Sequence, residues 1–401
     1  MKKYIFLLLI VLCLTGCQKK EINIENETNT IMEENFDFEN KTQLIIEEPI
    51  PEPTTEPEPT PKIYELSLIA VGDNLIHSPI YKKASNGDGT YNFLPMYENI
   101  KDTISSYDIS IINQETIFVE DDSYISSYPC FGTPIEMGNA LVDTGFDVIL
   151  NATNHTWDKK STGVTDTLNY WKQYPEITIL GIHENEEDFN TIDIIEKNNI
   201  KLALFNYTYG LNGFVLPNDK TYMVDLLDNK EKFINDVIKI ENDVDFTICF
   251  LHIGTEYVYE PTNYQVEYVN SLIDAGADII ICAHPHVIEP YDMITTQNGN
   301  SALVYYSCGN FISNQDEIDR VLGGMAEIKL QKTILEDNIT NEILNYDFIP
   351  IVTHYNSNIH TIYKLEDYTE ELAEQHRLKS KYNKFSIEYL WDLWNKILKK
   401  E

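Results

Sequence analysis

The stretch ADIIICAHPH, residues 277–286, joins an apolar run to two histidines. Short continuous runs rich in isoleucine are typical of strands that are buried on both faces of a sheet. His284 and His286 follow the run and flank one proline, whose ring fixes the backbone between the two imidazoles. The stretch therefore predicts a buried strand that carries two candidate metal ligands at its carboxyl end.

The same form recurs along the chain from residue 64. Segments of helical periodicity separate the apolar runs, and this alternation predicts an α/β layered architecture. After residue 323 the pattern changes to strand-like stretches and a helical C-terminal segment, which we expect to close the sheet and pack on the same body. The other runs are YELSLIAVGD (64–73), YDISIINQE (107–115), FDVILNATNH (146–155), ITILG (177–181), IKLALFNYT (200–208), VDFTICFLH (244–252) and SALVYYSCGN (301–310).

Residues that can bind metal stand at the carboxyl ends of most runs. In open α/β sheets this edge binds ligands, because successive strand ends converge there. Imidazole suits Zn, Fe and Mn, and a carboxylate can bridge two such ions, which together clamp the oxygens of an attacked group. The sequence therefore predicts a site for two divalent transition-metal ions. The candidate residues are Asp73, Glu115, Asn154, His155, His252, His284, His286 and Asn310.

Each of these residues taken alone also has a structural interpretation. The pairs Gly72-Asp73 and Asn154-His155 are common in turns. A single histidine after an apolar run, such as His252, is more often a hydrogen-bonded core residue than a ligand. Their joint occurrence at the ends of separate runs favours the ligand site.

Acidic residues dominate the composition. There are 65 Asp and Glu residues against 29 Lys and Arg, which gives a formal net charge of -36. Such a surface repels phosphate backbones, so nucleic-acid binding is not expected. For an anionic substrate, bound metal ions rather than a basic patch would supply the positive charge.

The first 17 residues, MKKYIFLLLIVLCLTGC, have the form of a secretion signal, with two lysines before an apolar stretch too short for a membrane span. Leu14-Thr15-Gly16-Cys17 resembles the bacterial lipobox, which implies a lipid on Cys17 and a place on the extracytoplasmic face of the cell membrane. An ordinary cleaved signal peptide is the alternative. We expect a disordered acidic, proline-rich linker at 18–62, a folded domain at 63–355 and a helical segment at 356–401 that packs on it.

Six motifs, read in order, resemble those of the CapA-type poly-γ-glutamate capsule biosynthesis proteins, a branch similar to the calcineurin-like metallophosphoesterases. They are VGDNLIH, INQE, NATNHTWD, LHIGTEY, AHPHVIEP and YYSCGNF, spread over residues 66–313. The resemblance implies a four-layer α/β/β/α sandwich of the metallophosphoesterase type with a dinuclear metal site.

The resemblance also implies a role for each motif residue. Asp73 matches the first metal-binding aspartate, and Glu115 takes the place of the bridging carboxylate. Asn154 matches the ligand asparagine, and His155 matches the histidine that contacts the scissile group. The remaining imidazole ligands implied are His252, His284 and His286.

The chain departs from the phosphoesterase pattern at one ligand. A histidine is expected two residues after the first aspartate, but Leu75 stands there, so the nearby His77 either replaces that ligand or plays no part. Two carboxylates near the motif histidines also have open roles. Asp158 either orients His155 or caps the following helix, and Glu256 is a candidate base or substrate contact.

These observations predict a lipid-anchored CapA-like protein that acts in the synthesis, export or processing of poly-γ-glutamate, an anionic polymer. If it hydrolyses a bond, His155 would stabilise or protonate the leaving side, and either a phosphoester or an amide could be attacked. A non-catalytic component that works with a polyglutamate synthetase or export proteins is one alternative. A secreted phosphoesterase unrelated to a capsule is another.

Some residues outside the motifs are predicted to have no part in the site. We expect Trp391 and Trp394, spaced as i and i+3, to pack in the core. Four histidines are predicted to lie on the surface, namely His183, His354, His360 and His376.

Overall fold

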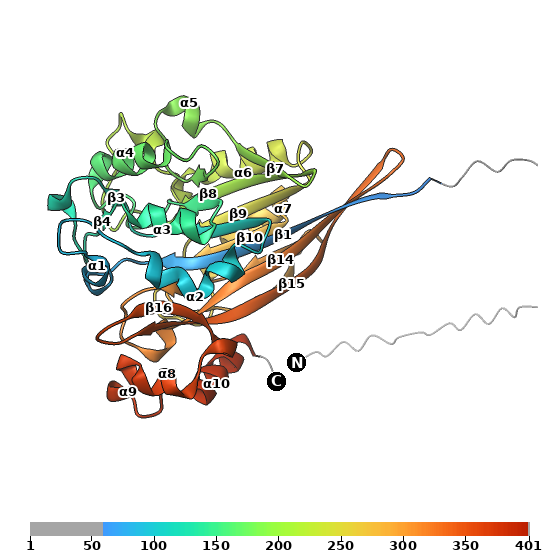
Figure 1. Cartoon of the computed structure of the whole chain (residues 1–401). Coiled ribbons are helices and arrows are strands. Elements are labelled where there is room, and N and C mark those ends of the chain that lie inside the picture. The colour runs from blue at the N-terminus through green and yellow to red at the C-terminus, as the bar shows by residue number, and fades with distance from the viewer. Residues whose placement is uncertain (1–58, 400–401) are drawn as a thin grey trace, which may run out of the picture. The chain divides into compact units, whose positions relative to one another are not determined.

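The computed structural model describes residues 59–399 and contains two large β-sheets (Figure 1). The first has eight strands, in the order β16 (His360–Lys364), β15 (Asn338–Tyr355), β14 (Leu322–Leu335), β1 (Lys62–Asn74), β2 (Ile109–Asn113), β5 (Val148–Leu150) and β6 (Thr178–Leu180), with β13 (Asn310–Ile312) paired to β1. The second has six, in the order β11 (Tyr291–Thr295), β12 (Ser301–Tyr305), β10 (Ile279–Ala283), β9 (Phe246–His252), β8 (Ile200–Thr208) and β7 (Asp193–Lys197). A small third sheet pairs β3 (Phe118–Val119) with β4 (Thr133–Pro134).

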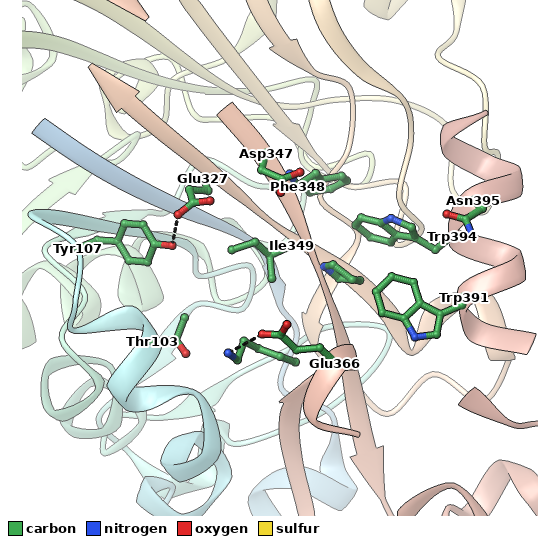
Figure 2. A pocket seen from close by; sticks show the side chains of 12 residues that line it. Thr103, Tyr107, Glu327, Asp347, Phe348, Ile349, Glu366, Trp391, Trp394 and Asn395 are labelled. Carbon is green, nitrogen blue, oxygen red and sulfur yellow. Dashed lines mark hydrogen bonds and ion pairs between the residues drawn. The ribbon is translucent and has the colours of Figure 1, made fainter. Parts of the chain in front are cut away.

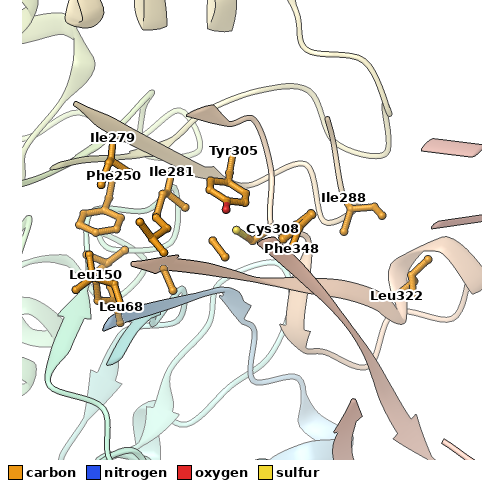
Figure 3. Packing of buried hydrophobic residues seen from close by; sticks show 14 of the residues in the cluster. Leu68, Leu150, Phe250, Ile279, Ile281, Ile288, Tyr305, Cys308, Leu322 and Phe348 are labelled. Atoms are coloured by element: carbon orange, nitrogen blue, oxygen red, sulfur yellow. The ribbon is translucent and has the colours of Figure 1, made fainter. Parts of the chain in front are cut away.

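Successive side chains on each large sheet divide between an inner and an outer apolar layer. On β1, Leu66 and Leu68 belong to the core between the sheets, whereas Ile69 belongs to the layer outside the first sheet. On β10, Ile281 lies in the inner core and Ile280 in the layer outside the second sheet. Figure 3 shows side chains of both sheets meeting in the inner core, among them Leu68, Leu150, Phe250, Ile279 and Ile281.

Helices cover both outer faces. The first sheet is covered by α1 (Ser78–Ala84), α2 (Leu94–Ile104) and α3 (Met137–Thr144), and the second by α6 (Lys230–Ile240) and α7 (Asn263–Ala275). The layers therefore follow the order α/β/β/α, and the predicted four-layer sandwich is confirmed. Further helices are α4 (Lys160–Trp171), α5 (Glu186–Phe189), α8 (Glu370–Gln375), α9 (Arg377–Lys381) and α10 (Ile387–Leu398). Of the helices between residues 59 and 399, none has both the length and the apolar composition that crossing a bilayer requires.

The strands that precede the motif residues run parallel to one another. In the first sheet β1, β2 and β5 are parallel neighbours, and in the second β8, β9 and β10 are. Every residue of β2, β9 and β10 is buried, as expected for parallel strands covered on both faces. Parallel strands end at the same edge of their sheet, so the polar residues that follow them are brought to that edge.

The C-terminal part extends the first sheet and then returns to the core. β14 and β15 form a long antiparallel hairpin beside β1, and β16 adds the edge strand. Residues 356–399 thus include a strand as well as the expected helices. Leu390, Leu393 and Trp394 of α10 belong to the same core cluster as the inner faces of the two sheets.

A cavity of about 490 Å³ lies between α10 and the first sheet (Figure 2). Trp391 and Trp394 line it from α10, and on another wall the Tyr107 hydroxyl donates to Glu327 at 2.6 Å. Trp394 is buried against Phe348, with ring centroids 5.0 Å apart, as expected of a core residue. The lining includes no histidine, so this cavity lacks the metal-ligand chemistry that the motifs predict.

The prediction that four histidines outside the motifs lie on the surface is wrong. They are at most 5% exposed, and each ring has a hydrogen-bonding partner that the sequence does not indicate. His183 contacts Asp225 and His354 contacts Tyr368, whereas the other two contact main-chain carbonyl groups. Burial is tolerated because each ring has at least one such contact, although His360 Nδ1 is buried without a partner. The corrected residues are His183, His354, His360 and His376.

His183 is held between two carboxylates. Its Nε2 lies 2.7 Å from Asp225 Oδ2, and its Nδ1 lies 3.8 Å from Asp188 Oδ2. Burial lowers the pKa of His183, but hydrogen bonding and charge from both carboxylates outweigh that effect and raise the pKa to about 9. Because this folded-state pKa exceeds the ordinary value of 6.5, the protonated pair stabilises the fold fully below pH 6.5 and loses that effect as the pH rises through 9.

We therefore expect the free energy of unfolding of the wild type to fall, relative to that of His183→Gln, as the pH rises from 6 to 10. The variant lacks the titrating ring, so it lacks this contribution. Urea unfolding of both proteins at several pH values measures the difference. Parallel curves over the whole range would show that the pair contributes nothing to stability.

Candidate metal centre

Side chains from both sheets meet at the edge where the parallel strands end. Asp73 is the second-last residue of β1, and Glu115 follows β2 by two residues. His252 ends β9, and His284 and His286 follow β10. All five side chains are at most 3% exposed, so a buried polar cluster lies at the rim of a sandwich whose interior is apolar.

Glu115 lies at the middle of this cluster. Its Oε1 is 3.8 Å from His252 Nε2, 3.8 Å from His286 Nε2 and 4.0 Å from His155 Nε2. These separations exceed a hydrogen bond, and both carboxylate oxygens are buried without a hydrogen-bonding partner. A buried carboxylate without compensation is costly, so the arrangement calls for a further positive species among the imidazoles.

The donor set fits a transition-metal ion. Within residues 59–399, one ligand atom each from Glu115, His284 and His286 lie within 4.8 Å of one another. Two atoms bound to one ion at about 2.1 Å stand roughly 3–4 Å apart, so a small inward movement would complete the coordination. His284 Nδ1 is also buried without a hydrogen-bonding partner. Orphaned carboxylate and imidazole donors are the groups that Zn, Fe and Mn bind.

Asp73 is positioned by a close approach between β1 and the segment before β13. A β-carbon on Gly72 would lie only 1.9 Å from the Gly309 carbonyl oxygen, so only glycine fits there. The Asp73 N–H donates to that same oxygen at 2.9 Å. The GD pair of the first motif is therefore explained by its contact with the glycine of the last motif.

The two histidines around Pro285 adopt backbone conformations that are unusual for non-glycine residues. His284 has φ 103° and His286 has φ 58°. Such conformations cost free energy and are found mainly at functional sites. The turn is held by the Tyr257 N–H, which donates to the Pro285 carbonyl at 2.8 Å, and by Asn310 Nδ2, which donates to the His286 carbonyl at 3.2 Å.

The turn places the His286 ring against Asp73. His286 Nδ1 lies 2.9 Å from Asp73 Oδ2 and 3.2 Å from Asn310 Oδ1. His286 Nε2 therefore faces Glu115, and the ring spans the two carboxylates. Asn310, a candidate from the sequence, supports this ring and the turn that carries it.

Asparagines connect His252 to the rest of the cluster. His252 Nε2 lies 3.0 Å from Asn154 Oδ1, and its Nδ1 lies 3.3 Å from Asn113 Nδ2. Asn113 also donates to Asp73 Oδ1 at 2.7 Å. Sequence reasoning missed Asn113, although its place at the end of β2, two residues before Glu115, was a signal that could have found it.

His155 is held by Asp158. His155 Nδ1 lies 2.7 Å from Asp158 Oδ2, and the same oxygen accepts the Phe131 N–H at 2.6 Å. Helix α4 begins at Lys160 and has no side-chain cap, so Asp158 makes the orienting contact and not the capping one. Asn212, a second residue that sequence reasoning missed, brings its Nδ2 to 3.2 Å from His155 Nδ1.

Two other sequence candidates stand apart from these contacts. His77 Nδ1 accepts the Asn314 N–H at 3.2 Å, and among the described residues the group of metal-ligand atoms does not include His77. Burial lowers the His77 pKa to about 4. Glu256 is exposed, and its negative charge helps to raise the pKa values of Glu115 and His286. It thus acts on the cluster through charge at its outer side.

The buried carboxylates and imidazoles shift one another's protonation. Burial, together with the charge of Asp73, raises the pKa of Glu115 well above its usual range. Burial and neighbouring imidazoles hold the pKa values of His252 and His284 well below theirs. Burial lowers the pKa of His286, but Glu115 and Asp73 raise it to about 9. Two imidazoles are thus neutral and ready to bind a metal ion, and the remaining protons must leave when it binds.

Comparison with known proteins gives one family match in the folded domain and one at the N-terminus. Residues 67–315 match the family model "Bacterial capsule synthesis protein PGA_cap". Residues 1–18, outside the described part, match the model "Prokaryotic membrane lipoprotein lipid attachment site". The predicted lipobox around Cys17 is therefore a recognised attachment motif, consistent with a membrane-anchored lipoprotein.

Two curated relatives are similar over part of their length. "Capsule biosynthesis protein CapA" of Bacillus anthracis is 26% identical over 185 residues, which is 45% of this chain and 43% of that protein. "PGA biosynthesis protein CapA" of Bacillus subtilis is 30% identical over 181 residues, 45% of this chain and 46% of that protein. The matched part thus spans less than half the length of these relatives.

Solved structures with a distant likeness include a phosphatase from Mycoplasma pneumoniae, with 15% identity, a TM-score of 0.42, and coverage of 73% of this chain and 95% of that one. The NAD nucleotidase of Haemophilus influenzae has 13% identity, a TM-score of 0.44, and coverage of 84% and 60%. At these scores neither likeness bears on activity. The family model, in contrast, matches more than half of the chain and includes the whole second sheet, part of the first and every motif of the buried cluster, so the protein belongs to the family of bacterial capsule synthesis proteins PGA_cap.

Proposed function

We propose that the protein is a lipid-anchored, extracytoplasmic component of poly-γ-glutamate synthesis, export or processing that works through a dinuclear metal site. Family membership and the names of the two CapA relatives support the link to the polymer. The observation that carries the metal site is the buried Glu115 carboxylate, whose unpaired oxygens face three imidazoles.

The proposed ligands divide around Glu115, which would bridge two divalent ions of Mn, Zn or Fe. His286, which contacts Asp73, and His252, which contacts Asn154, would provide the further ligands together with those two residues. Bound ions of this kind supply Lewis acidity and lower the pKa of water. They would also compensate the charge of the two buried carboxylates, Asp73 and Glu115. His284 completes the imidazole set.

His155 is proposed to handle the proton of the leaving group. Asp158 holds its Nδ1, which leaves Nε2 on the side of Glu115, 4.0 Å from Oε1. A histidine oriented by a carboxylate is suited to general acid catalysis, because the carboxylate stabilises the protonated ring. This pair favours hydrolysis over simple polymer binding, and it suits a phosphoester or an amide equally.

The ligand assignment predicts that Glu115→Gln, His284→Ala and His286→Ala each lower metal affinity by about 100-fold or more, because each removes one donor. Metal per protein after dialysis, measured by emission spectrometry, checks this. His183→Gln is the control, since it removes a buried histidine elsewhere. Circular dichroism verifies folding. Wild-type metal content in all three variants would contradict the assignment.

The proposed role of His155 predicts that His155→Gln lowers turnover by about 100- to 10,000-fold while metal content stays unchanged. Mn- or Zn-loaded protein is assayed against poly-γ-glutamate and against aryl phosphates. Cleavage of the polymer supports a processing role, and cleavage of the phosphates alone supports the unrelated phosphoesterase. Metal binding without turnover of either substrate assigns the non-catalytic role.

The lipid anchor predicts that Cys17→Ser moves the protein from the membrane to the soluble fraction, because no acyl chains remain to hold it. Fractionation of cells followed by immunoblotting measures the distribution, with Cys130→Ser as the control that leaves the lipobox intact. Retention of Cys17→Ser in the membrane fraction would argue against lipidation.

A further inference from the structure

Arg320 lies beside the candidate metal centre, where its guanidinium stacks on an aromatic ring. It ends the short 3-10 turn Ile318–Arg320 and is one of two arginines in the sequence. Its Nε is buried and has no hydrogen-bonding partner. Among residues 59–399 its guanidinium joins no ion pair, and its Cζ lies 3.6 Å from the centroid of the Tyr257 ring.

Nearby carboxylates are occupied by another cation. Asp316 and Glu317 precede Arg320 in the chain, yet they pair with Lys381, whose Nζ lies 3.1 Å from Asp316 Oδ2 and 2.9 Å from Glu317 Oε1. Within residues 59–399 the partly buried Arg320 guanidinium therefore stands near these two carboxylates but reaches neither at ion-pair distance. The cost of withdrawing its donors from water is recovered when an acceptor binds them.

Arg320 is connected to the centre by one contact of its backbone and one of its side chain. The Arg320 carbonyl accepts from Asn310 Nδ2 at 2.9 Å, and Asn310 Oδ1 lies 3.2 Å from His286 Nδ1. The Tyr257 ring, beneath the guanidinium, lies 6.0 Å from the His286 ring between centroids. The Tyr257 ring therefore contacts the Arg320 guanidinium and also neighbours His286, a proposed metal ligand.

Tyr257 is a rigid support. Its backbone has φ 65°, and its N–H donates to the Pro285 carbonyl at 2.8 Å, within the turn that carries the two histidines. Gln315 Nε2 donates to its hydroxyl at 3.3 Å. The ring face stabilises the guanidinium through a cation–π contact and leaves the planar edge of Arg320 to bind a ligand.

We propose that Arg320, stacked on Tyr257, binds an oxyanion of the substrate beside the metal centre. The planar donors of arginine match the two oxygens of a carboxylate or a phosphate, so the bound group is a side-chain carboxylate of a γ-linked glutamate polymer or the phosphate of a phosphoester. This inference rests on the proposed function, because it extends the substrate contacts of that same site. Arg320 would also provide this acidic protein with a fixed positive charge that can bind an anionic substrate.

The test uses the full-length protein in detergent micelles, loaded with Mn, and titration calorimetry with two probes, inorganic phosphate and a γ-linked glutamate oligomer. We expect Arg320→Gln to weaken binding of at least one probe by about 10- to 100-fold, because a charged hydrogen-bonding partner is lost. The probe that is weakened identifies the oxyanion. Lys381→Gln is the matched control, since it removes a neighbouring cation that is already paired, and we expect a change of less than about twofold.

Arg320→Lys separates charge from geometry. It keeps the positive charge but loses the paired donors, so binding should weaken by about 3- to 10-fold, and it decides the matter if Arg320→Gln does not fold. Equal binding of both probes by the wild type and the Arg320 variants would overturn the inference, and so would failure of the wild type to bind either probe. Metal content is read separately. A wild type without metal refutes the proposed function, whereas unchanged metal with unchanged probe binding refutes only the role of Arg320.

Discussion

The buried carboxylate of Glu115 is the constraint around which the site is organised. An ionised carboxylate withdrawn from water without hydrogen bonds costs several kcal/mol or more, so the fold is stable only if a proton or a cation compensates it. Burial raises the Glu115 pKa, and the neighbouring carboxylates raise the His286 pKa to about 9, so protons fill part of this role when no metal is bound. A divalent ion would fill it better, because it satisfies the carboxylates and the neutral imidazoles at once.

The sandwich supplies the rigidity that such a cluster requires. Parallel strands buried on both faces fix the positions of Asp73, Glu115 and His252, and close contacts between motifs fix the rest. The approach of Gly72 to Gly309 and the strained turn at His284 and His286 are tolerated because the surrounding apolar layers hold the backbone in place. Part of the stability that packing provides is therefore offset by the backbone strain that holds these side chains at fixed distances from one another.

Charge gives a consistent account of the protein as a whole. A net charge of -36 disfavours the approach of an anionic polymer, so local cations must attract it. The proposed metal ions and Arg320 would form that positive region, and the negative charge of the exposed Glu256 opposes it. The same charge arrangement suits a polymer carboxylate or a phosphoester, so chemistry at the site decides between them.

The sequence by itself determined the layered α/β class, the strands and the motif residues at their ends, because continuous apolar runs and their polar termini are local features. The ordered motifs also predicted the family, which the family match shows. Only the tertiary structure decided which of these residues touch. Asn113 and Asn212 entered the cluster through contacts between strands and loops distant in sequence, and His183, His354, His360 and His376 proved buried because their partners come from other segments. The role proposed for Arg320 likewise depends on the tertiary structure, which shows its stacking on Tyr257 and its buried, unpaired Nε. Long-range packing, and not the local sequence pattern, sets what surrounds a side chain.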